Sequence, residues 1–211
     1  MGPGHEEIAK RATESVGIAM TYSMGPFDAV RVLTAMDTRG QLGRSKARND
    51  AAQKADADWL FFLDADDLMH PECLEHSLHV LEGKDAVFGV TTELIDGNIV
   101  TRYQIPEIKD YPTLIKYNPF LTVKMGHFVR TEVARETPFN TEMDCGEDWE
   151  YYLRLWQAHD CIKVNRPFFI KYRGQHSIGP RSATGRDWNI AVEKLISDAR
   201  RDYAEAQRED G

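Results

Sequence analysis

The sequence has few cysteines, and their placement argues against a disulfide framework or a zinc site of the usual spacing. The three cysteines among 211 residues are Cys73, Cys145 and Cys161, an odd number separated by long gaps. They indicate reduced thiols of an intracellular protein. No apolar run approaches the roughly 18 residues of a membrane-spanning helix, and the polar start MGPGHEEIAKR shows no signal peptide. We therefore expect a soluble, cytoplasmic protein.

Positive charge is also scarce. The chain carries 26 Lys and Arg against 34 Asp and Glu, for a net charge of −8, which argues against a general nucleic-acid-binding surface. An anionic ligand must then be bound by a local basic cluster. Repeats and low-complexity tracts are absent from the sequence. Hydrophobic residues make up 42% and aromatic residues 10%, so the chain has the composition of an ordinary globular domain.

The apolar pattern alternates between strand-like and helix-like segments, which predicts an α/β fold. We expect a first buried strand at 15–22, a weaker one at 29–36 and a central strand in DWLFFL, and the further strands are expected at 86–92, in the hairpin ELIDGNIVTRY, in HFVR, in CIKV and in PFFIKY. The predicted helices are 43–55, 71–83, 147–158 and 187–207. This pattern divides the chain into a polar segment (1–14), a main α/β domain (15–182) and a C-terminal amphipathic helix (183–211).

The stretch WLFFLDADDLMHPECL places three carboxylates directly after an apolar run. Asp64, Asp66 and Asp67 repel one another at this spacing, and the end of a strand is where ligands bind in open α/β sheets. A divalent cation such as Mg²⁺ or Mn²⁺ would remove the repulsion. The alternative is a solvated turn that caps the next helix. An EF-hand is discarded, because the loop lacks the glycine and the late glutamate of that motif.

A basic cluster precedes this loop in an otherwise acidic chain. Arg44, Lys46 and Arg48 occur within GRSKARND, and the two arginines share one helix face. Basic side chains near a helix start attract phosphate, although a solvated basic face is the plainer interpretation. Together, the carboxylates and the arginines indicate a site for a metal ion and a diphosphate.

Three segments in order resemble family 2 glycosyltransferases, which have the GT-A fold. They are ARNDAAQKADADWLFFLDADDLMHP, GEDWEYYLRLW and YRGQHSIGPRS, spread over residues 47 to 182. The chain departs from the family pattern before the first of them, because only about two dozen residues separate Tyr22 from Arg48. The resemblance therefore implies an abbreviated nucleotide-base pocket, and the match of AMDTRG around Asp37 to a base-reading residue is weak.

The resemblance implies a metal site and a donor site. Asp66 would be the principal metal ligand, Asp64 would lie close to the metal or the ribose, and His176 would complete the coordination of Mn²⁺ or Mg²⁺. Asp67 would support or cap the loop. The residues expected to bind substrate are Tyr22, Arg48, Asp64, Trp149 and Arg173, with Arg181 as a further phosphate contact. Arg48 would brace both the nucleotide and the Asp64 side chain.

The second segment supplies the candidate base. Asp148 stands at the start of the predicted helix 147–158, where the helix dipole keeps a carboxylate ionised, and it would accept the proton of the acceptor hydroxyl. Glu147 would hold the acceptor or brace the loop; helix capping by two acids is the alternative. Trp149 would stack on an acceptor sugar or belong to the core. In KMGHFVR, Gly126 would allow close backbone approach and His127 would touch the donor sugar.

These residues together predict a metal-dependent, inverting glycosyltransferase that uses a nucleotide diphosphate sugar, most simply a UDP-sugar, and a carbohydrate or glycolipid acceptor. A sugar nucleotidyltransferase is the second enzyme class, but TYSMGPFD holds one glycine and no basic residue where such enzymes carry a Gly-rich basic loop. A non-catalytic nucleotide-sugar-binding module is the third alternative. The C-terminal helix would pack on the domain, form a homodimer or lie on a membrane.

Overall fold

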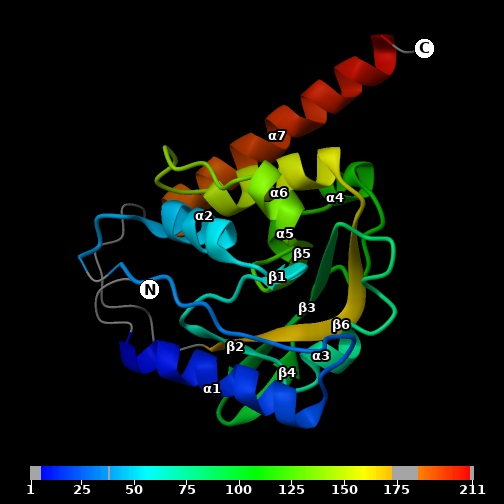
Figure 1. Cartoon of the computed structure of the whole chain (residues 1–211). Helices are drawn as coiled ribbons and strands as arrows, with labels where there is room; N and C mark the ends of the chain where they lie inside the picture. The colour runs from blue at the N-terminus through cyan, green and yellow to red at the C-terminus, as the bar shows by residue number, and fades with distance from the viewer. Residues whose placement is uncertain (1–5, 38, 173–184, 210–211) are drawn as a thin grey trace.

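The computed structural model describes residues 6–37, 39–172 and 185–209, and these form one mixed sheet between two layers of helices (Figure 1). The helices are α1 (Glu6–Tyr22), α2 (Arg44–Lys54), α3 (Cys73–His76), α4 (Tyr111–Lys116), the 3-10 helix η1 (Pro119–Leu121), α5 (Thr131–Glu136), α6 (Glu147–Ala158) and α7 (Gly185–Glu209). The strands are β1 (Trp59–Phe61), β2 (Asp67–Met69), β3 (Ala86–Ile95), β4 (Asn98–Thr101), β5 (His127–Arg130) and β6 (Cys161–Tyr172).

The sheet combines parallel and antiparallel pairs. The strand order within the described residues is β1-β5-β3-β6-β2, with β4 paired to the far part of β3. β3 and β6 run parallel, from the pair Ala86↔Cys161 to the pair Leu94↔Tyr172, and the other strand pairs are antiparallel. The α/β fold predicted from the sequence is thus present, with a mixed central sheet.

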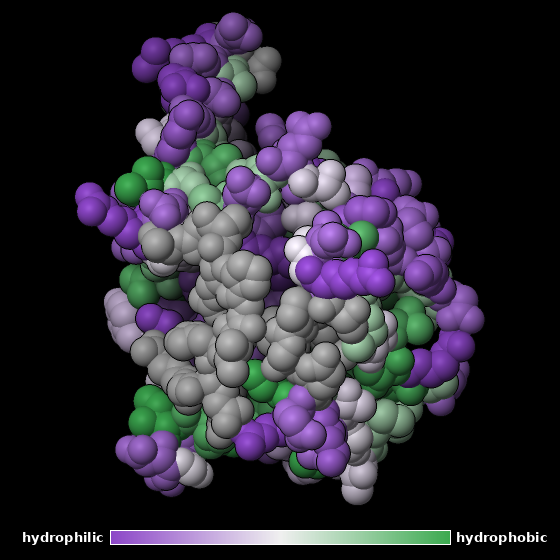
Figure 2. Space-filling model, turned by 90° about the vertical axis from the view of Figure 1, so that its left-hand side faces the viewer, coloured by the Kyte–Doolittle hydropathy of each residue, from purple (hydrophilic) through white to green (hydrophobic). Residues whose placement is uncertain are grey.

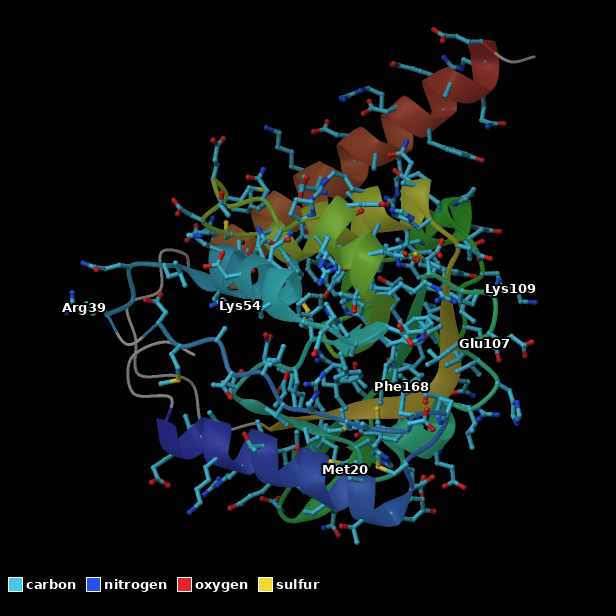
Figure 3. All side chains as sticks on the ribbon, viewed as in Figure 1. Met20, Arg39, Lys54, Glu107, Lys109 and Phe168 are labelled. Atoms are coloured by element: carbon cyan, nitrogen blue, oxygen red, sulfur yellow. The ribbon has the colours of Figure 1, made fainter. Side chains whose placement is uncertain are left out.

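Each face of the sheet is covered by its own core. Along β3, Ala86 and Phe88 face the core under α5, α6 and α7, while Val87 faces the core under α1 and α3, as the two-residue period of a strand requires. Figure 3 shows Met20 of α1 and Phe168 of β6 on the second side. Burial on both faces explains why β3 reads as a nearly continuous apolar run.

The predicted first strand is wrong, because residues 15–22 are the end of helix α1. Ala9, Ala12, Val16 and Ala19 are all buried, and their spacing of three, four and three residues puts them on one side of a helix. The prediction used only the apolar last part of this pattern. The expected division between residues 14 and 15 falls inside the same helix.

The predicted strand at 29–36 is wrong as well. This segment has no regular secondary structure, and Val32, Leu33 and Met36 are exposed. Because no strand forms at 29–36, β1 is not the central strand that was expected in DWLFFL. Within the described residues, β1 ends the strand order and pairs with β5. The helix expected at 71–83 is shortened to α3, since His79 takes a left-handed φ of 64°.

Most of the remaining predicted elements are confirmed. Asp96 and Gly97 form the β3–β4 turn with φ of 49° and 80°, as a type I′ hairpin requires. CIKV and PFFIKY belong to one strand, β6, whose pairing with β3 shifts register between them.

Helix α7 packs on the domain through Val192 and Ile196, which are buried, and its far end projects beyond the body (Figure 1). No described helix is long and apolar enough to cross a membrane, and the three cysteines are free.

Gly126 provides a stability prediction. Its φ is 93°, and a Cβ at this position would lie 2.4 Å from Cδ1 of Phe169. We expect Gly126→Ala to lower the free energy of unfolding by about 2–4 kcal/mol through backbone strain and overpacking, measured by urea denaturation. Gly17→Ala in α1 is the control, because nothing lies within 4 Å of its Cβ position and we expect it to stabilise by about 0.5–1 kcal/mol. Equal stability of Gly126→Ala and wild type would contradict this packing.

Candidate functional site

A cleft of about 1930 Å³ opens between α2, the loop after β1 and the start of α6. The acidic loop, Asp148 and the segment 120–125 all line it. Figure 2 looks onto the side of the molecule where α2 begins and shows hydrophilic residues recessed in the surface. The cleft exceeds the roughly 300–1,000 Å³ of a site for one small molecule, and its lining extends from α1 to α7.

The three carboxylates of the acidic loop converge in this cleft. Asp64, Asp66 and Asp67 each present an oxygen within 4.8 Å of the others. The backbone N–H of Asp67 donates to the Asp64 carbonyl at 3.0 Å, which closes the loop into a turn between β1 and β2. An all-oxygen donor set of this charge fits a hard cation such as Mg²⁺ or Mn²⁺. The residues present therefore fit the metal that the sequence predicts.

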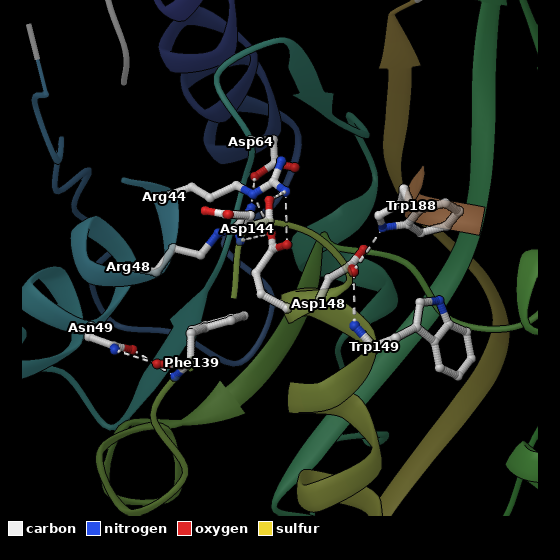
Figure 4. Close-up of polar contacts among 10 residues, drawn as sticks. Arg44, Arg48, Asn49, Asp64, Phe139, Asp144, Asp148, Trp149 and Trp188 are labelled. Carbon is white, nitrogen blue, oxygen red and sulfur yellow. Dashed lines mark hydrogen bonds and ion pairs between the residues drawn. The ribbon is translucent and has the colours of Figure 1, made fainter. Parts of the chain in front are cut away.

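Two arginines of α2 hold the acids of the cleft in place (Figure 4). Arg48 donates to Asp64 at 2.6 Å and to Glu147 at 3.4 Å, so the expected contact between Arg48 and Asp64 is present. Arg44 donates to both carboxylate oxygens of Glu147, at 2.5 and 2.9 Å. Both guanidinium groups are thus paired with carboxylates, and phosphate binding by this basic cluster stays a prediction.

These ion pairs also influence the pKa values of Asp64 and Glu147. Burial alone raises the pKa of Asp64, but the Arg48 guanidinium outweighs it, so the pKa of this carboxyl lies below its ordinary value. Burial raises the pKa of Glu147, and the nearby Asp148 adds to the rise, while the two arginines oppose it. Glu147 is only 3% exposed and is held by both arginines, an arrangement that favours the bracing alternative over contact with the acceptor.

Asn49, the last residue of the Ala-Arg-Asn sequence, contacts the segment before α6. Its amide donates to the Phe139 carbonyl and accepts from the Phe139 N–H, both at 2.8 Å. Arg48 lies over the Phe139 ring at 5.1 Å, where a cation is attracted to the ring face. Ala47 is buried beneath. Arg48 and Asn49 thus connect α2 to the segment that leads into α6.

Asp148 lies in the first turn of α6, behind Gly146 with its φ of 77°. Its Oδ1 accepts from the Trp149 N–H at 2.9 Å and from the Trp188 indole Nε1 at 3.1 Å (Figure 4). The helix dipole favours a carboxylate in this position. Asp148 therefore faces the cleft as an oriented anion, with its indole partner supplied by α7.

Three other predicted residues lie elsewhere. The Trp149 ring is fully buried in the core, which excludes stacking on a sugar. His127 is also fully buried, stacks on Phe88 at 4.3 Å and has its pKa lowered to about 3 by burial, so it is a neutral core residue. Tyr22 ends α1, where its hydroxyl donates to Glu72 at 3.5 Å outside the cleft lining. Arg173, His176 and Arg181 lie outside the described residues.

The sequence did not single out Lys124 or Trp188 as site residues. Lys124 lines the cleft and lies 5.4 Å from the ring of Trp188 and 5.9 Å from that of Phe120. Burial lowers the pKa of Lys124 to about 8, against the opposing influence of Asp148. A lysine within the apolar segment FLTVKMGHF was the available signal for Lys124. Trp188 gave no such signal, because it contacts Asp148 only through the packing of α7.

Loss of the Arg48 contacts gives a second stability prediction. Arg48→Ala removes one partner from Glu147 and leaves Asp64 unpaired, so we expect the free energy of unfolding to fall by about 1–3 kcal/mol. The expected loss is smaller than for a fully buried ion pair, because Asp64 is 37% exposed and Arg44 remains on Glu147. Urea denaturation measures it. The matched control is Lys46→Ala in the same helix, whose exposed pair with Asp50 contributes less than about 1 kcal/mol; equal losses would contradict the bracing function.

Comparison with known proteins supports the family resemblance. The model of "Glycosyl transferase family 2" matches residues 28–141. An uncharacterised glycosyltransferase of Methanocaldococcus jannaschii, MJ1057, is 26% identical over 141 residues, which cover 63% of this chain and 47% of that protein. The chain thus spans about half the length of this curated relative.

Solved structures show the same fold. Residues 1–349 of S. aureus TarS in complex with UDP-GlcNAc match with a TM-score of 0.63 at 16% identity, over 94% of this chain and 64% of that one. The same protein in complex with UDP matches with a TM-score of 0.60 at 15% identity, with the same coverage. The predicted GT-A-type α/β fold is confirmed.

Proposed function

Because this chain belongs to glycosyl transferase family 2, we propose that it transfers a sugar from a nucleotide diphosphate sugar to an acceptor hydroxyl. The observation that carries the proposal is one cleft lined by both the acidic loop with Asp66 and the oriented carboxylate of Asp148. UDP is the nucleotide we favour, since the solved TarS structures of the same fold contain UDP-GlcNAc or UDP.

The acidic loop is the proposed metal site. Asp66 and Asp64 would hold Mn²⁺ or Mg²⁺, with Asp67 beside them and with His176 as a proposed further ligand. A cation held there offsets the negative charge that develops on the departing diphosphate. The protein prepares the site in advance: Arg48 fixes the Asp64 carboxylate, and Glu147 fixes Arg48. This support keeps the ligands in one arrangement before the donor binds.

Asp148 is the proposed base. The acceptor oxygen attacks the anomeric carbon, the bond from that carbon to the diphosphate oxygen breaks, and the hydroxyl proton passes to Asp148. Among the described residues, both hydrogen bonds to this carboxylate reach Oδ1, which leaves Oδ2 for the acceptor. Attack from the side opposite the leaving group inverts the anomeric centre. A glycosidase, by contrast, needs a second carboxyl to protonate its leaving group.

The acceptor is proposed to be a carbohydrate or glycolipid hydroxyl. It would approach past Lys124, Lys171 and Trp188, which line the cleft near Asp148.

Homodimer formation through α7 is a separate proposal. Within the described residues, the apolar side of α7 is already covered by its own domain, so such a dimer would use the projecting charged end, and light scattering after gel filtration would reveal it.

A donor screen tests the function. Release of nucleoside diphosphate would be measured over a panel of nucleotide sugars, with Mn²⁺, with Mg²⁺ and with EDTA. We expect metal-dependent turnover of at least one UDP-sugar. Pyrophosphate release from a nucleoside triphosphate and a sugar phosphate would instead identify a nucleotidyltransferase, and saturable binding of the donor without any turnover in the presence of acceptors would identify a binding module.

A further inference from the structure

A second cluster of potential metal ligands lies outside the cleft. His70 follows β2, Glu72 precedes α3, and His76 ends α3, and all three are partly buried. None of them lines the cleft. The acidic loop reaches β2 at its first residue and this cluster begins just after its last, so one three-residue strand separates the two groups.

The geometry of the cluster suits a single ion. One ring nitrogen of each histidine and one oxygen of Glu72 lie within 4.8 Å of one another. The two imidazole rings are 5.8 Å apart between centroids and inclined by 25°. Ligand atoms around tetrahedral Zn²⁺ are roughly 3.4 Å apart, so small rotations of the side chains would bring the three donor atoms to that separation. Two imidazoles and one carboxylate form a donor set for a first-row transition metal rather than for Mg²⁺ or Ca²⁺.

The hydrogen bonds of His76 leave one of its ring nitrogens facing a second acceptor. Its Nδ1 lies 2.9 Å from the Pro167 carbonyl oxygen, which only accepts, so Nδ1 carries a proton. In the neutral ring Nε2 is then a bare lone pair, yet it faces a Glu72 carboxylate oxygen at 3.2 Å. Two lone pairs that face each other at this distance repel, and a metal ion that both atoms bind would remove the repulsion. A carbonyl partner on the other ring nitrogen is also the usual support of a metal-bound histidine.

The surroundings hold the cluster against the sheet. The His70 N–H donates to the Phe168 carbonyl at 2.9 Å, and the Glu72 N–H donates to His70 Nδ1 at 3.2 Å. Cys73 and Leu74 at the start of α3 are buried. An ion bound here would therefore tie the segment after β2 to β6 at the point where that strand shifts register.

We propose that His70, Glu72 and His76 bind a Zn²⁺-class transition-metal ion that fixes the β2–α3 segment to β6. We assign the site a structural role, because none of its three side chains lines the cleft. It is independent of the Mn²⁺ or Mg²⁺ site of the proposed function.

Metal titration of the full chain, produced without a histidine tag, tests this site. Zn²⁺ binding would be measured by calorimetry in excess Mg²⁺, and Co²⁺ binding by its visible absorption, both in an Asp66→Asn background that weakens the cleft site. We expect one equivalent of tightly bound metal and a higher melting temperature with Zn²⁺. His76→Asn should weaken binding at least 10-fold and abolish the rise in melting temperature.

His79→Asn is the matched control, since His79 is an exposed neighbour with a φ of 64° that asparagine tolerates. Glu72→Gln is a second variant of nearly unchanged shape, and circular dichroism verifies that each variant folds. Absence of Co²⁺ absorption in the Asp66→Asn protein, or an equal loss of binding in His79→Asn, overturns the proposal.

Discussion

Asp148→Asn is expected to reduce the rate of sugar transfer by about 10²–10⁴-fold, the usual contribution of a general base. The amide keeps the shape of the carboxylate and can still accept from Trp188 and from the Trp149 N–H. It cannot take the acceptor proton at neutral pH. We therefore expect kcat to fall while the dissociation constant for the donor, measured by calorimetry with UDP and metal, stays within a few-fold of the wild-type value.

The matched control for this variant is Glu150→Gln. Glu150 belongs to the same first turn of α6 but pairs with Arg154, so its neutralisation should leave transfer nearly unchanged. Transfer by Asp148→Asn at the wild-type rate would show that another group accepts the proton. Loss of both donor binding and transfer would show that Asp148 helps to form the donor site instead.

Asp66→Asn is expected to reduce metal-dependent transfer by about 10³-fold, because charge stabilisation by a bound cation is worth several kcal/mol. The substitution removes one negative charge from the acidic loop and keeps its size. Mn²⁺ affinity, followed by electron paramagnetic resonance of the free ion, should fall in parallel. Folding should be unaffected or slightly improved, since the three carboxylates repel one another without a cation.

Asp50→Asn serves as the control for the same change of charge at an exposed site, where the carboxylate pairs with Lys46. It should leave Mn²⁺ affinity and transfer unchanged. If Asp66→Asn binds Mn²⁺ as wild type does, the acidic loop is only a solvated turn. If it loses Mn²⁺ and still transfers sugar, the reaction does not depend on this ion.

The candidate site could be predicted from the sequence where its residues interact locally. Arg48 and Asp64 are 16 positions apart and are joined by one helix and one strand, so the Ala-Arg-Asn and Asp-x-Asp sequences together specify their contact. Trp188 and Asp148 are 40 positions apart, and nothing in either local sequence indicates that they meet. For Glu147 the sequence left two alternatives open, holding the acceptor or bracing the loop, because neither of its arginine partners is close to it in the sequence.

The fold was predicted least well before residue 44. Residues 15–22 are apolar enough for a buried strand, but the alanines at 9 and 12 extend the pattern to a helix, and alanine is a weak hydrophobic signal with the strongest helix propensity. The segment 29–36 alternates as a strand does, yet no described strand pairs with it. Strand formation depends on a partner, which a local pattern cannot reveal.

The hydrogen bond from the Trp188 indole to Asp148 makes the last helix a part of the proposed catalytic site. Trimming the protein before Gly185, a natural choice for simplifying it, would remove the indole donor and uncover the apolar side of the domain that Val192 and Ile196 now shield. We expect a shortened protein to retain its acidic loop but to transfer sugar to the acceptor poorly. Any assay meant to judge this enzyme should therefore use the chain with its tail.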